Sequence, residues 1–402
     1  MEKKKHILVV TQYFYPEQFR INDMCAEWVK RGYKVTVVTG IPNYPQGEYF
    51  EGYNKQHKRT ETWNGIDIIR LSIAPRKTGS VNMAKNYFSF VWSGLWWKIK
   101  TKIKADYVFC FEVSPMTQAL VAVWYAKKRK IPCYLYVQDL WPENVEIVTG
   151  IHNPLVIKPI GAMVNYIYKN CTHIFGTSPS FVKEIQKRCK DKSKVSYWPQ
   201  YAEEFYVPVD RSEANENCPE IPNDNSFKIC FTGNIGQAQG LEILPEAAKV
   251  LKNENVKFII VGDGRNRKNF EKAIKDNGIE EKFILVGRQP SERIPAMLGC
   301  CDAAFLSFQK EELWTKTIPA KLQSYMACGM PIIAAAEGET ERIVGEAKCG
   351  LCSEIGNSEQ LAETIKKMLE MDTVSMGKKS RVYFESHFLK TKLMDEIQIY
   401  FE

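Results

Sequence analysis

The sequence predicts an α/β protein with two Rossmann-like domains. In both halves of the 402-residue chain, short apolar runs alternate with segments of helical length and period, the pattern of parallel βαβ units. A polar, acidic stretch containing Pro219 and Pro222 separates the halves. The length is sufficient for two cores of ordinary size. We therefore predict a first domain over residues 1–205, a linker over 206–226 and a second domain over 227–380.

The composition and net charge of the chain limit the kinds of function that it can have. The chain is 45% hydrophobic and 25% charged with a net charge of +8, which is typical of a soluble globular protein. This charge suits an anionic ligand or an anionic membrane surface, and it is too dispersed to indicate nucleic-acid binding. The twelve cysteines are scattered without a zinc-binding pattern, which favours reduced thiols in a cytoplasmic protein. The apolar run after the N-terminal lysines is too short for a signal peptide, and no uncharged run approaches the roughly 18 residues of a membrane span.

The first half is predicted to contain six strands and a helix over 22–31. The strands are expected at 6–10, 35–39, 66–71, 107–111, 133–137 and 174–176. The loops 13–21 and 41–47 follow the first two strands, at the sheet edge where open α/β sheets bind ligands. Their candidate contact residues are Tyr15, Glu17, Arg20, Asn43 and Tyr44.

A helix over 83–104 carries apolar residues on two sides. One stripe is expected to pack on the sheet and consists of Phe88, Val91, Trp92, Leu95, Ile99 and Ile103. The other side combines aromatic and basic residues, which suits a helix at a membrane interface: Met83, Phe90, Trp97, Lys98, Lys100 and Lys104. The alternative is a doubly buried helix at a domain junction.

Glycine-containing loops follow the predicted strands of the second half. The strands are expected at 227–231, 258–261, 283–286, 303–306 and 331–335, and the loops gather at one edge of a parallel sheet. Their glycines allow the backbone to approach a phosphate. Neither a G-x-G-x-x-G fingerprint nor a Walker A motif is present. The candidate residues are Gly233, Gly236, Gly262, Asp263, Gly264 and Arg288.

The stretch 311–331 predicts an anion site at the start of a helix over 320–327. Pro319 suits the first turn, and Gly329 ends the helix. The free N–H groups and the positive helix end suit a diphosphate, with Thr317, Ile318, Pro319 and Ala320 supplying the backbone. The available cations are Arg265, Arg288 and Lys321. No D-x-D triplet occurs, so the leaving group is expected to be stabilised by these cations and helix N-termini rather than by a metal.

These motifs resemble the family 4 retaining glycosyltransferases. The matching segments are Gly233–Leu241, Val261–Gly264, Val286–Arg288 and Tyr325–Pro331, with Pro42–Pro45, Gly52–Tyr53 and Gln138–Glu143 in the first half. The resemblance is closest to the bacterial O-antigen and capsule subgroup typified by N-acetylfucosamine transferases. It implies a GT-B fold, with the acceptor on the first domain, the nucleotide-sugar on the second and a cleft between them. It also implies a C-terminal helix, here about 381–402, that crosses back to the first domain, and a reaction without cofactor or metal.

The sequence departs from the pattern of this family at the donor site. The two positions of its E-x7-E motif fall on Lys316 and Ser324, and neither is acidic. The ribose contact could pass to Gln323 or Ser324. The sugar contact could pass to Glu311, to Glu312 or to the backbone at 317–319. Glu312 and Lys321 are candidate catalytic residues, with Lys321 as the charge. Two usual basic residues of the first glycine loop are replaced by Asn234 and Gln239.

Two acidic residues at strand ends are candidates for contact with the acceptor. Asp139 is a candidate base or orienting group for the acceptor hydroxyl, and its alternative is a turn or N-cap role before Pro142. Glu112 is a candidate acceptor contact, although a helix cap by Ser114 explains its neighbourhood equally well.

The leading hypothesis is a hexosyltransferase acting at the inner face of the plasma membrane. It would move N-acetylfucosamine or another N-acetylated hexose from a UDP-sugar to a polyprenyl-diphosphate-linked glycan of lipopolysaccharide or capsule. One alternative is a nucleotide-sugar 2-epimerase or hydrolase on the same scaffold, for which Glu311, Glu312 and Asp139 are the candidate acids. The other is a non-catalytic GT-B partner protein.

Overall fold

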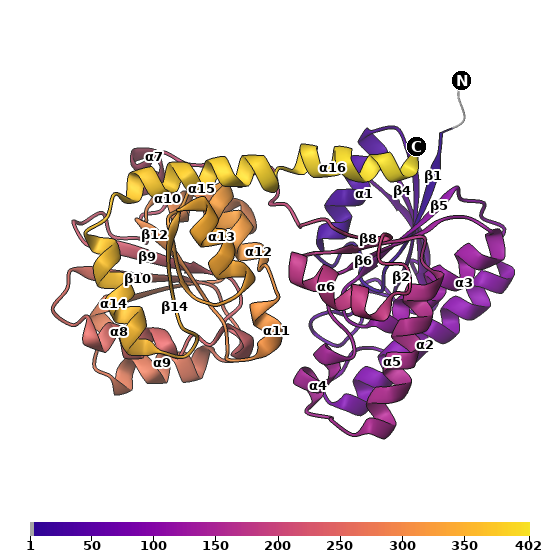
Figure 1. Cartoon of the computed structure of the whole chain (residues 1–402), viewed down its shortest axis with the longest axis horizontal. Coiled ribbons are helices and arrows are strands. Elements are labelled where there is room, and N and C mark those ends of the chain that lie inside the picture. Colours follow the sequence, from indigo (N-terminus) through magenta and orange to yellow (C-terminus); the bar gives the residue numbers. More distant parts are fainter. Residues whose placement is uncertain (1–3) are drawn as a thin grey trace. The chain divides into compact units, whose positions relative to one another are not determined.

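The computed structural model describes residues 4–402 and divides into two compact units between Trp198 and Pro199 (Figure 1). Each unit is a parallel β-sheet flanked by helices, as the sequence predicts. The division lies before the boundary at 205/206 that we predict from the sequence, because the chain beyond Trp198 already packs with the second unit.

The first domain contains an eight-stranded sheet in the order β3-β4-β2-β1-β5-β6-β7-β8. All neighbouring strands are parallel except β3 and β4. The strands β1, β4 and β6 have the predicted bounds, whereas β3 and β8 are not predicted. The bounds are β1 (His6–Val10), β2 (Lys34–Gly40), β3 (Thr60–Trp63), β4 (Ile66–Leu71), β5 (Tyr107–Glu112), β6 (Cys133–Val137), β7 (His173–Gly176) and β8 (Val195–Tyr197).

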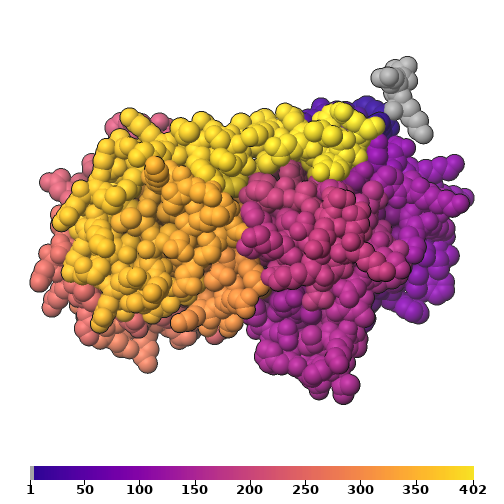
Figure 2. Space-filling view, viewed as in Figure 1, coloured from indigo at the N-terminus to yellow at the C-terminus, as the bar shows by residue number. Residues whose placement is uncertain are grey.

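The helices of the first domain include a protruding pair, α4 and α5, which stands out from the rest of the domain surface (Figure 1, Figure 2). Asn153 caps α5 by accepting a hydrogen bond from the Leu155 N–H at 2.9 Å, and Pro154 occupies its first turn. The helices are α1 (Arg20–Lys30), α2 (Ser80–Lys100), α3 (Ala119–Arg129), α4 (Glu143–Thr149), α5 (Pro154–Asn170) and α6 (Pro179–Arg188).

The predicted orientation of helix α2 is wrong. Its buried stripe is Asn86, Phe90 and Gly94, and a Cβ on Gly94 would lie 2.4 Å from a methyl carbon of Val121 in α3. Gly94 therefore allows the two helices to approach closely. Asn86 is tolerated inside because its side-chain oxygen accepts a hydrogen bond from Gln12 Nε2 at 2.6 Å.

As a result, the membrane candidates of α2 are not on one outer face. Phe90 is fully buried, Met83 is half-buried, and Trp97 stacks on Tyr125 with ring centroids 5.4 Å apart. Lys98 lies 6.0 Å from the Trp124 ring, and Lys100 lies 5.9 Å from the Trp96 ring. The exposed aromatic and aliphatic residues are instead those that we expected on the sheet side: Phe88, Trp92 and Ile99, together with Trp96.

The second domain contains a fully parallel six-stranded sheet in the order β11-β10-β9-β12-β13-β14. Its apolar strand residues pack in two clusters, one on each face of the sheet. The strands are β9 (Phe227–Thr232), β10 (Val256–Val261), β11 (Phe283–Gly287), β12 (Ala303–Ser307), β13 (Ile332–Ala335) and β14 (Gly350–Ser353).

The helices of the second domain include α12 (Ala320–Ala327), which has the predicted bounds. The C-terminal segment that we predicted as one helix divides near Phe388 into α15 and α16. Its crossing to the first domain concerns the arrangement of the two units and stays a prediction. The remaining helices are α7 (Arg211–Asn217), α8 (Ile243–Val250), α9 (Arg267–Asp276), α10 (Ile294–Gly299), α11 (Glu312–Thr315), α13 (Glu339–Ala347), α14 (Ser358–Leu369), α15 (Thr373–His387) and α16 (Lys390–Gln398).

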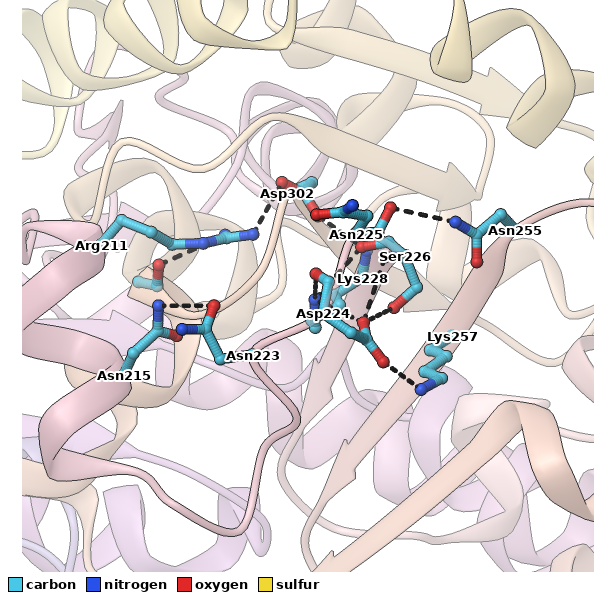
Figure 3. A network of polar contacts seen from close by, with 11 residues as sticks. Arg211, Asn215, Asn223, Asp224, Asn225, Ser226, Lys228, Asn255, Lys257 and Asp302 are labelled. Carbon is cyan, nitrogen blue, oxygen red and sulfur yellow. Dashed lines mark hydrogen bonds and ion pairs between the residues drawn. The ribbon is translucent and has the colours of Figure 1, made fainter.

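The predicted linker 206–226 is an ordered part of the second domain. It contains α7, whose Ala214 is fully buried in the same cluster as α10. Figure 3 shows the polar contacts that fix it: Arg211 pairs with Asp302 at 3.1 Å, and Asp224 pairs with Lys228 at 3.1 Å and with Lys257. The Lys257 ammonium, aided by Ser226, lowers the pKa of Asp224.

Among residues 4–402, the structure has no helix that is long and apolar enough to cross a membrane.

The orientation of α2 is testable by stability. We expect Phe90→Ala to lower the free energy of unfolding of the first domain by about 3–5 kcal/mol, because it opens a cavity at a fully buried position. Trp92→Ala, at a position that is 63% exposed, should change it by no more than about 0.5 kcal/mol. Denaturant unfolding monitored by far-UV circular dichroism measures both values. A large loss for Trp92→Ala and a small one for Phe90→Ala would restore the orientation predicted from the sequence.

Candidate functional site

The glycine loops after β9 and β10 of the second domain pack against each other at the carboxyl edge of the sheet. Gly233 N–H donates to Val261 O at 2.8 Å, and Ile235 N–H donates to Asp263 O at 2.9 Å. A Cβ on Gly262 would lie 1.8 Å from Gly233 O, so no other residue fits there without moving the loops. Loop-to-loop packing is therefore one physical reason for Gly262, besides the approach of a ligand.

Helix α12 brings Lys321 against these loops. The Tyr325 hydroxyl accepts a hydrogen bond from Thr232 N–H at 2.9 Å and so fixes the helix beside the end of β9. The Lys321 amine lies 3.9 Å from the centre of the Phe231 ring and donates to Gln239 Oε1 at 2.5 Å. Its side chain passes Gly233, where a Cβ would meet Lys321 Cε at 2.9 Å.

The environment of Lys321 is that of an anion-binding cation. None of the ion pairs within residues 4–402 includes Lys321, and burial lowers the pKa of its amine to about 7. The N–H groups at the start of α12 lie at the same edge, where Pro319 provides no side-chain cap. A bound diphosphate would provide the negatively charged partner that the Lys321 ammonium does not have within residues 4–402.

Two further cations flank the loops. Arg265 and Arg288 are exposed, and neither forms a hydrogen bond or ion pair with another residue in the described range 4–402. Asp263 accepts a hydrogen bond from Gly264 N–H at 2.7 Å. Asn234 lies over the same loop, because a Cβ on Gly264 would be 2.7 Å from its side-chain oxygen. The predicted cations and glycine loops therefore come together at this edge.

Several other predicted donor residues make internal contacts. Gln323 donates to Gln200 O at 2.8 Å, and Ser324 donates to Ala320 O at 3.1 Å, so both side chains are used within the domain. Thr317 donates to Leu313 O at 3.0 Å, and the Ile318 side chain is buried. Glu312 is exposed and pairs with Lys316 at 2.8 Å. At this stretch the backbone at Pro319–Ala320 remains the more accessible contact.

The first domain contains a cavity of about 720 Å³, which is lined by α2, α4, α5 and the loops after β1, β2, β4, β5 and β6. This volume lies within the range of small-ligand sites. Its wall is mainly apolar and aromatic, with a few polar groups. The lining includes Tyr13, Tyr44, Arg76, Met83, Tyr87, Phe88, Ser114, Asp139, Trp141, Asn144, Val148, Val156, Ile160 and Met163.

Ser114 forms hydrogen bonds with three of the other residues that line this cavity. Its N–H donates to Asp139 Oδ2 at 2.6 Å, and its hydroxyl accepts from Asn144 Nδ2 at 2.7 Å and from Trp141 Nε1 at 3.1 Å. Burial raises the pKa of Asp139, whereas the Ser114 hydrogen bonds and the charge of Arg76 act in the opposite direction. Asp139 is therefore held in place with one carboxylate oxygen bonded to the protein.

Glu112 lies next to Asp139 but does not line the cavity. It is fully buried, and neither of its carboxyl oxygens has a hydrogen-bond partner among residues 4–402. Burial and the charge of Asp139 raise the pKa of Glu112 well above its usual value.

Most of the candidate residues in the loops 13–21 and 41–47 form contacts outside the cavity and do not line it. Glu17 accepts hydrogen bonds from Asn43 N–H at 2.8 Å and Tyr44 N–H at 2.7 Å, and so joins the two loops. Asn43 accepts from Arg76 N–H at 2.7 Å. Tyr15 stacks on Trp63 with ring centroids 4.5 Å apart, and Arg20 begins α1 outside the lining. Of the five candidates, only Tyr44 lines the cavity.

The sequence prediction missed Arg76. Its guanidinium lies 5.2 Å from the Tyr44 ring and 6.0 Å from the Tyr13 ring, and donates to the Tyr87 hydroxyl at 3.5 Å. Arg76 follows β4 at the carboxyl edge of the sheet, so its position after a buried strand could have identified it.

Comparison with known proteins finds a family match in the second domain. Residues 215–385 match the family described as Glycosyl transferases group 1. The Anabaena protein HepE, solved in complex with UDP and glucose, superposes with a TM-score of 0.73 at 14% identity and covers 99% of each chain. The chain therefore has the GT-B fold.

Three curated relatives are similar over longer stretches. A probable glycosyltransferase of Pseudomonas aeruginosa, WbjE, is 26% identical over 63% of this chain and 64% of its own length. WcaI of Escherichia coli K12, a putative colanic acid biosynthesis glycosyl transferase, is 27% identical over 83% and 84%. A Campylobacter jejuni enzyme that adds N-acetylgalactosamine to a diphospho-undecaprenol-linked acceptor is 22% identical over 75% and 76%.

The pKa of Lys321 predicts how diphosphate binding depends on pH. Because UDP favours the charged amine, its binding should take up protons near pH 7 and weaken by up to about tenfold per pH unit above it. Calorimetry in buffers of different ionisation enthalpy measures this uptake. Lys321→Met should abolish the uptake, whereas Lys268→Met, a change at an exposed position of α9, should leave it unchanged. Equal proton uptake in both variants would remove Lys321 from the site.

Proposed function

We propose that this chain, whose residues 215–385 match the family described as Glycosyl transferases group 1, transfers a hexose from a UDP-sugar to a polyprenyl-diphosphate-linked glycan of a surface polysaccharide. The anomeric configuration would be retained. The observation that carries the proposal is the Lys321 amine, which lies without an ion-pair partner in residues 4–402 between the glycine loops and the start of α12.

The cations of the second domain suit the leaving group of such a reaction. Negative charge develops on the diphosphate as the sugar–oxygen bond breaks, and preorganised cations and N–H groups stabilise it there. Lys321, Arg265 and Arg288 are the candidates, and they supply this charge without a metal ion. The UDP bound to HepE, with the same fold, supports a uridine nucleotide. The Campylobacter relative supports an N-acetylated hexose, of which N-acetylfucosamine is our specific candidate.

Asp139 is the candidate group that receives the acceptor hydroxyl. Ser114 fixes one of its oxygens and leaves the other for a hydroxyl in the cavity. The raised pKa of Asp139 makes its carboxylate a stronger base than an exposed aspartate.

The exposed face of α2 supports peripheral binding at the cytoplasmic side of the plasma membrane. Phe88, Trp92, Trp96 and Ile99 recur at helical spacing and are 48–69% exposed. Lys100 lies beside Trp96 and can interact with anionic head groups. The Campylobacter relative acts on an undecaprenol-linked acceptor, which is a membrane substrate.

The reaction is testable with UDP-N-acetylhexoses and a short-chain prenyl-diphosphate N-acetylglucosamine as acceptor. We expect UDP release and a product larger by one N-acetylhexose residue, measured by mass spectrometry, with the anomeric configuration determined by NMR. Asp139→Asn should lower kcat by about 10²–10⁴-fold, because the amide cannot accept the proton, and should leave UDP affinity unchanged.

Asp67→Asn, at an exposed position of β4, is the matched control and should retain full activity. Release of free epimer or free sugar, without transfer, would contradict a transferase and favour the epimerase or hydrolase alternative. UDP binding without any turnover would instead indicate a non-catalytic partner.

Membrane binding is testable by flotation with vesicles containing anionic lipid. The wild type should float with these vesicles, and Trp92→Glu with Ile99→Glu should release it, because both charges would enter the apolar boundary of the bilayer. Val374→Glu, a change at a position of α15 that is 68% exposed, is the control. Equal flotation of the double variant and the wild type would exclude this face of α2.

A further inference from the structure

The cavity of the first domain continues onto the protein surface through apolar residues. Phe88, Val148 and Val156 line it and are nevertheless 69%, 61% and 40% exposed. Leu155, the neighbour of Val156 at the start of α5, is 84% exposed. Large exposed apolar side chains at the rim of an apolar cavity are typical of a site for a lipophilic ligand.

The lining of the cavity also contains a cation, Arg76. Arg76 forms no ion pair with any carboxylate in residues 4–402 and is surrounded by the rings of Tyr13, Tyr44 and Tyr87. A guanidinium that is partly removed from water requires a negative partner, and its planar donors match phosphate oxygens. Asp139 lines the same cavity, but Ser114 rather than Arg76 donates to its carboxylate.

The lining of the cavity therefore combines a wide apolar wall, partly exposed at its rim, with a cation and hydrogen-bonding groups. A free phosphate would leave the apolar wall in contact with water, and a neutral lipid would leave Arg76 without a counter-charge. A prenyl chain that ends in a diphosphate satisfies both the apolar wall and the cation.

We propose that this cavity binds the prenyl-diphosphate end of the acceptor, with Arg76 at the diphosphate and the wall formed by α2, α4 and α5 around the first isoprene units. The proposal rests on the proposed function and assigns its lipid substrate to a particular site. A cavity of about 720 Å³ cannot enclose a long polyprenol, so the rest of the chain leaves over Phe88 and Val156. Phe88 also belongs to the exposed face of α2, so the exit is next to the surface that we propose as membrane-binding.

Farnesyl diphosphate, used below its micellar concentration, tests the cavity without a membrane. The full chain should bind it at least tenfold more tightly than it binds pyrophosphate or farnesol, measured by calorimetry. Saturating UDP should not displace it, because the candidate UDP site is in the second domain. Absence of binding, or displacement by UDP, would overturn the proposal.

Variants at the apolar rim and at Arg76 make the test specific. Phe88→Glu with Val156→Glu, both at exposed positions, should weaken binding at least tenfold without affecting folding. Arg76→Met should reduce the affinity to that of farnesol, whereas Arg76→Lys should retain part of it. The loops should survive both changes, because Asn43 accepts from the Arg76 backbone N–H and not from its side chain.

Trp92→Glu is the matched control. It lies on the same exposed face of α2 but outside the cavity lining, so farnesyl diphosphate should bind it as tightly as the wild type. Equal weakening by Trp92→Glu and by the rim variant would overturn the cavity in favour of non-specific surface adsorption.

The failures of the two proposals are distinguishable. If UDP-sugar is transferred but the rim and Arg76 variants keep the wild-type KM for the lipid-linked acceptor, the cavity assignment is wrong and the proposed function stands. If farnesyl diphosphate binds as described but no UDP-sugar is turned over, the proposed transferase activity is wrong while the cavity retains its ligand class.

Discussion

Parallel strand pairing is the constraint on which both candidate sites depend. Every pair of neighbouring strands in the two sheets is parallel except β3–β4, so the chain returns through a crossover after each strand. The loops at the carboxyl ends of the strands consequently meet at one edge of each sheet. In the second domain Gly262 packs on Gly233 there, and in the first Glu17 joins two loops. Each domain thus presents a fixed set of side chains at its loop edge.

Much of the fold could be predicted because strands buried on both faces are continuous apolar runs. The bounds of β1, β4 and β6 follow from such runs, and those of α12 follow from Pro319 and Gly329. The strand β3, with the sequence TETW, is an exposed edge strand and has no such run. The orientation of α2 could not be predicted, because Asn86 and Gly94 occupy its buried stripe. Hydrophobicity places both outside, whereas a hydrogen bond and a close helix contact place them inside.

The candidate site was predictable where chemistry follows directly from backbone position. Glycines after parallel strands must lie at the loop edge, so the sequence predicts Gly233 there, and the helix start at Pro319 predicts Lys321 in the first turn of α12. The hydrogen bonds that a side chain forms within the protein cannot be predicted from backbone position. Gln323 and Glu17 are polar residues at the correct edge, yet their side chains bond to the protein backbone. Arg76 was missed because it follows β4 through an irregular segment rather than directly.

Lys321 and Arg76, neither of which has an ion-pair partner within residues 4–402, differ in a way that matches the two substrates of the proposed reaction. The buried Arg70, by contrast, pairs with Glu61. Lys321 has a pKa of about 7, so it can gain a proton as the leaving diphosphate accumulates charge and lose it again when the product departs. Arg76 remains charged at all physiological pH values, which suits a lipid diphosphate whose charge does not change during transfer. An adjustable cation in the second domain and a permanent one in the first are therefore consistent with a diphosphate on each substrate, of which only one is the leaving group.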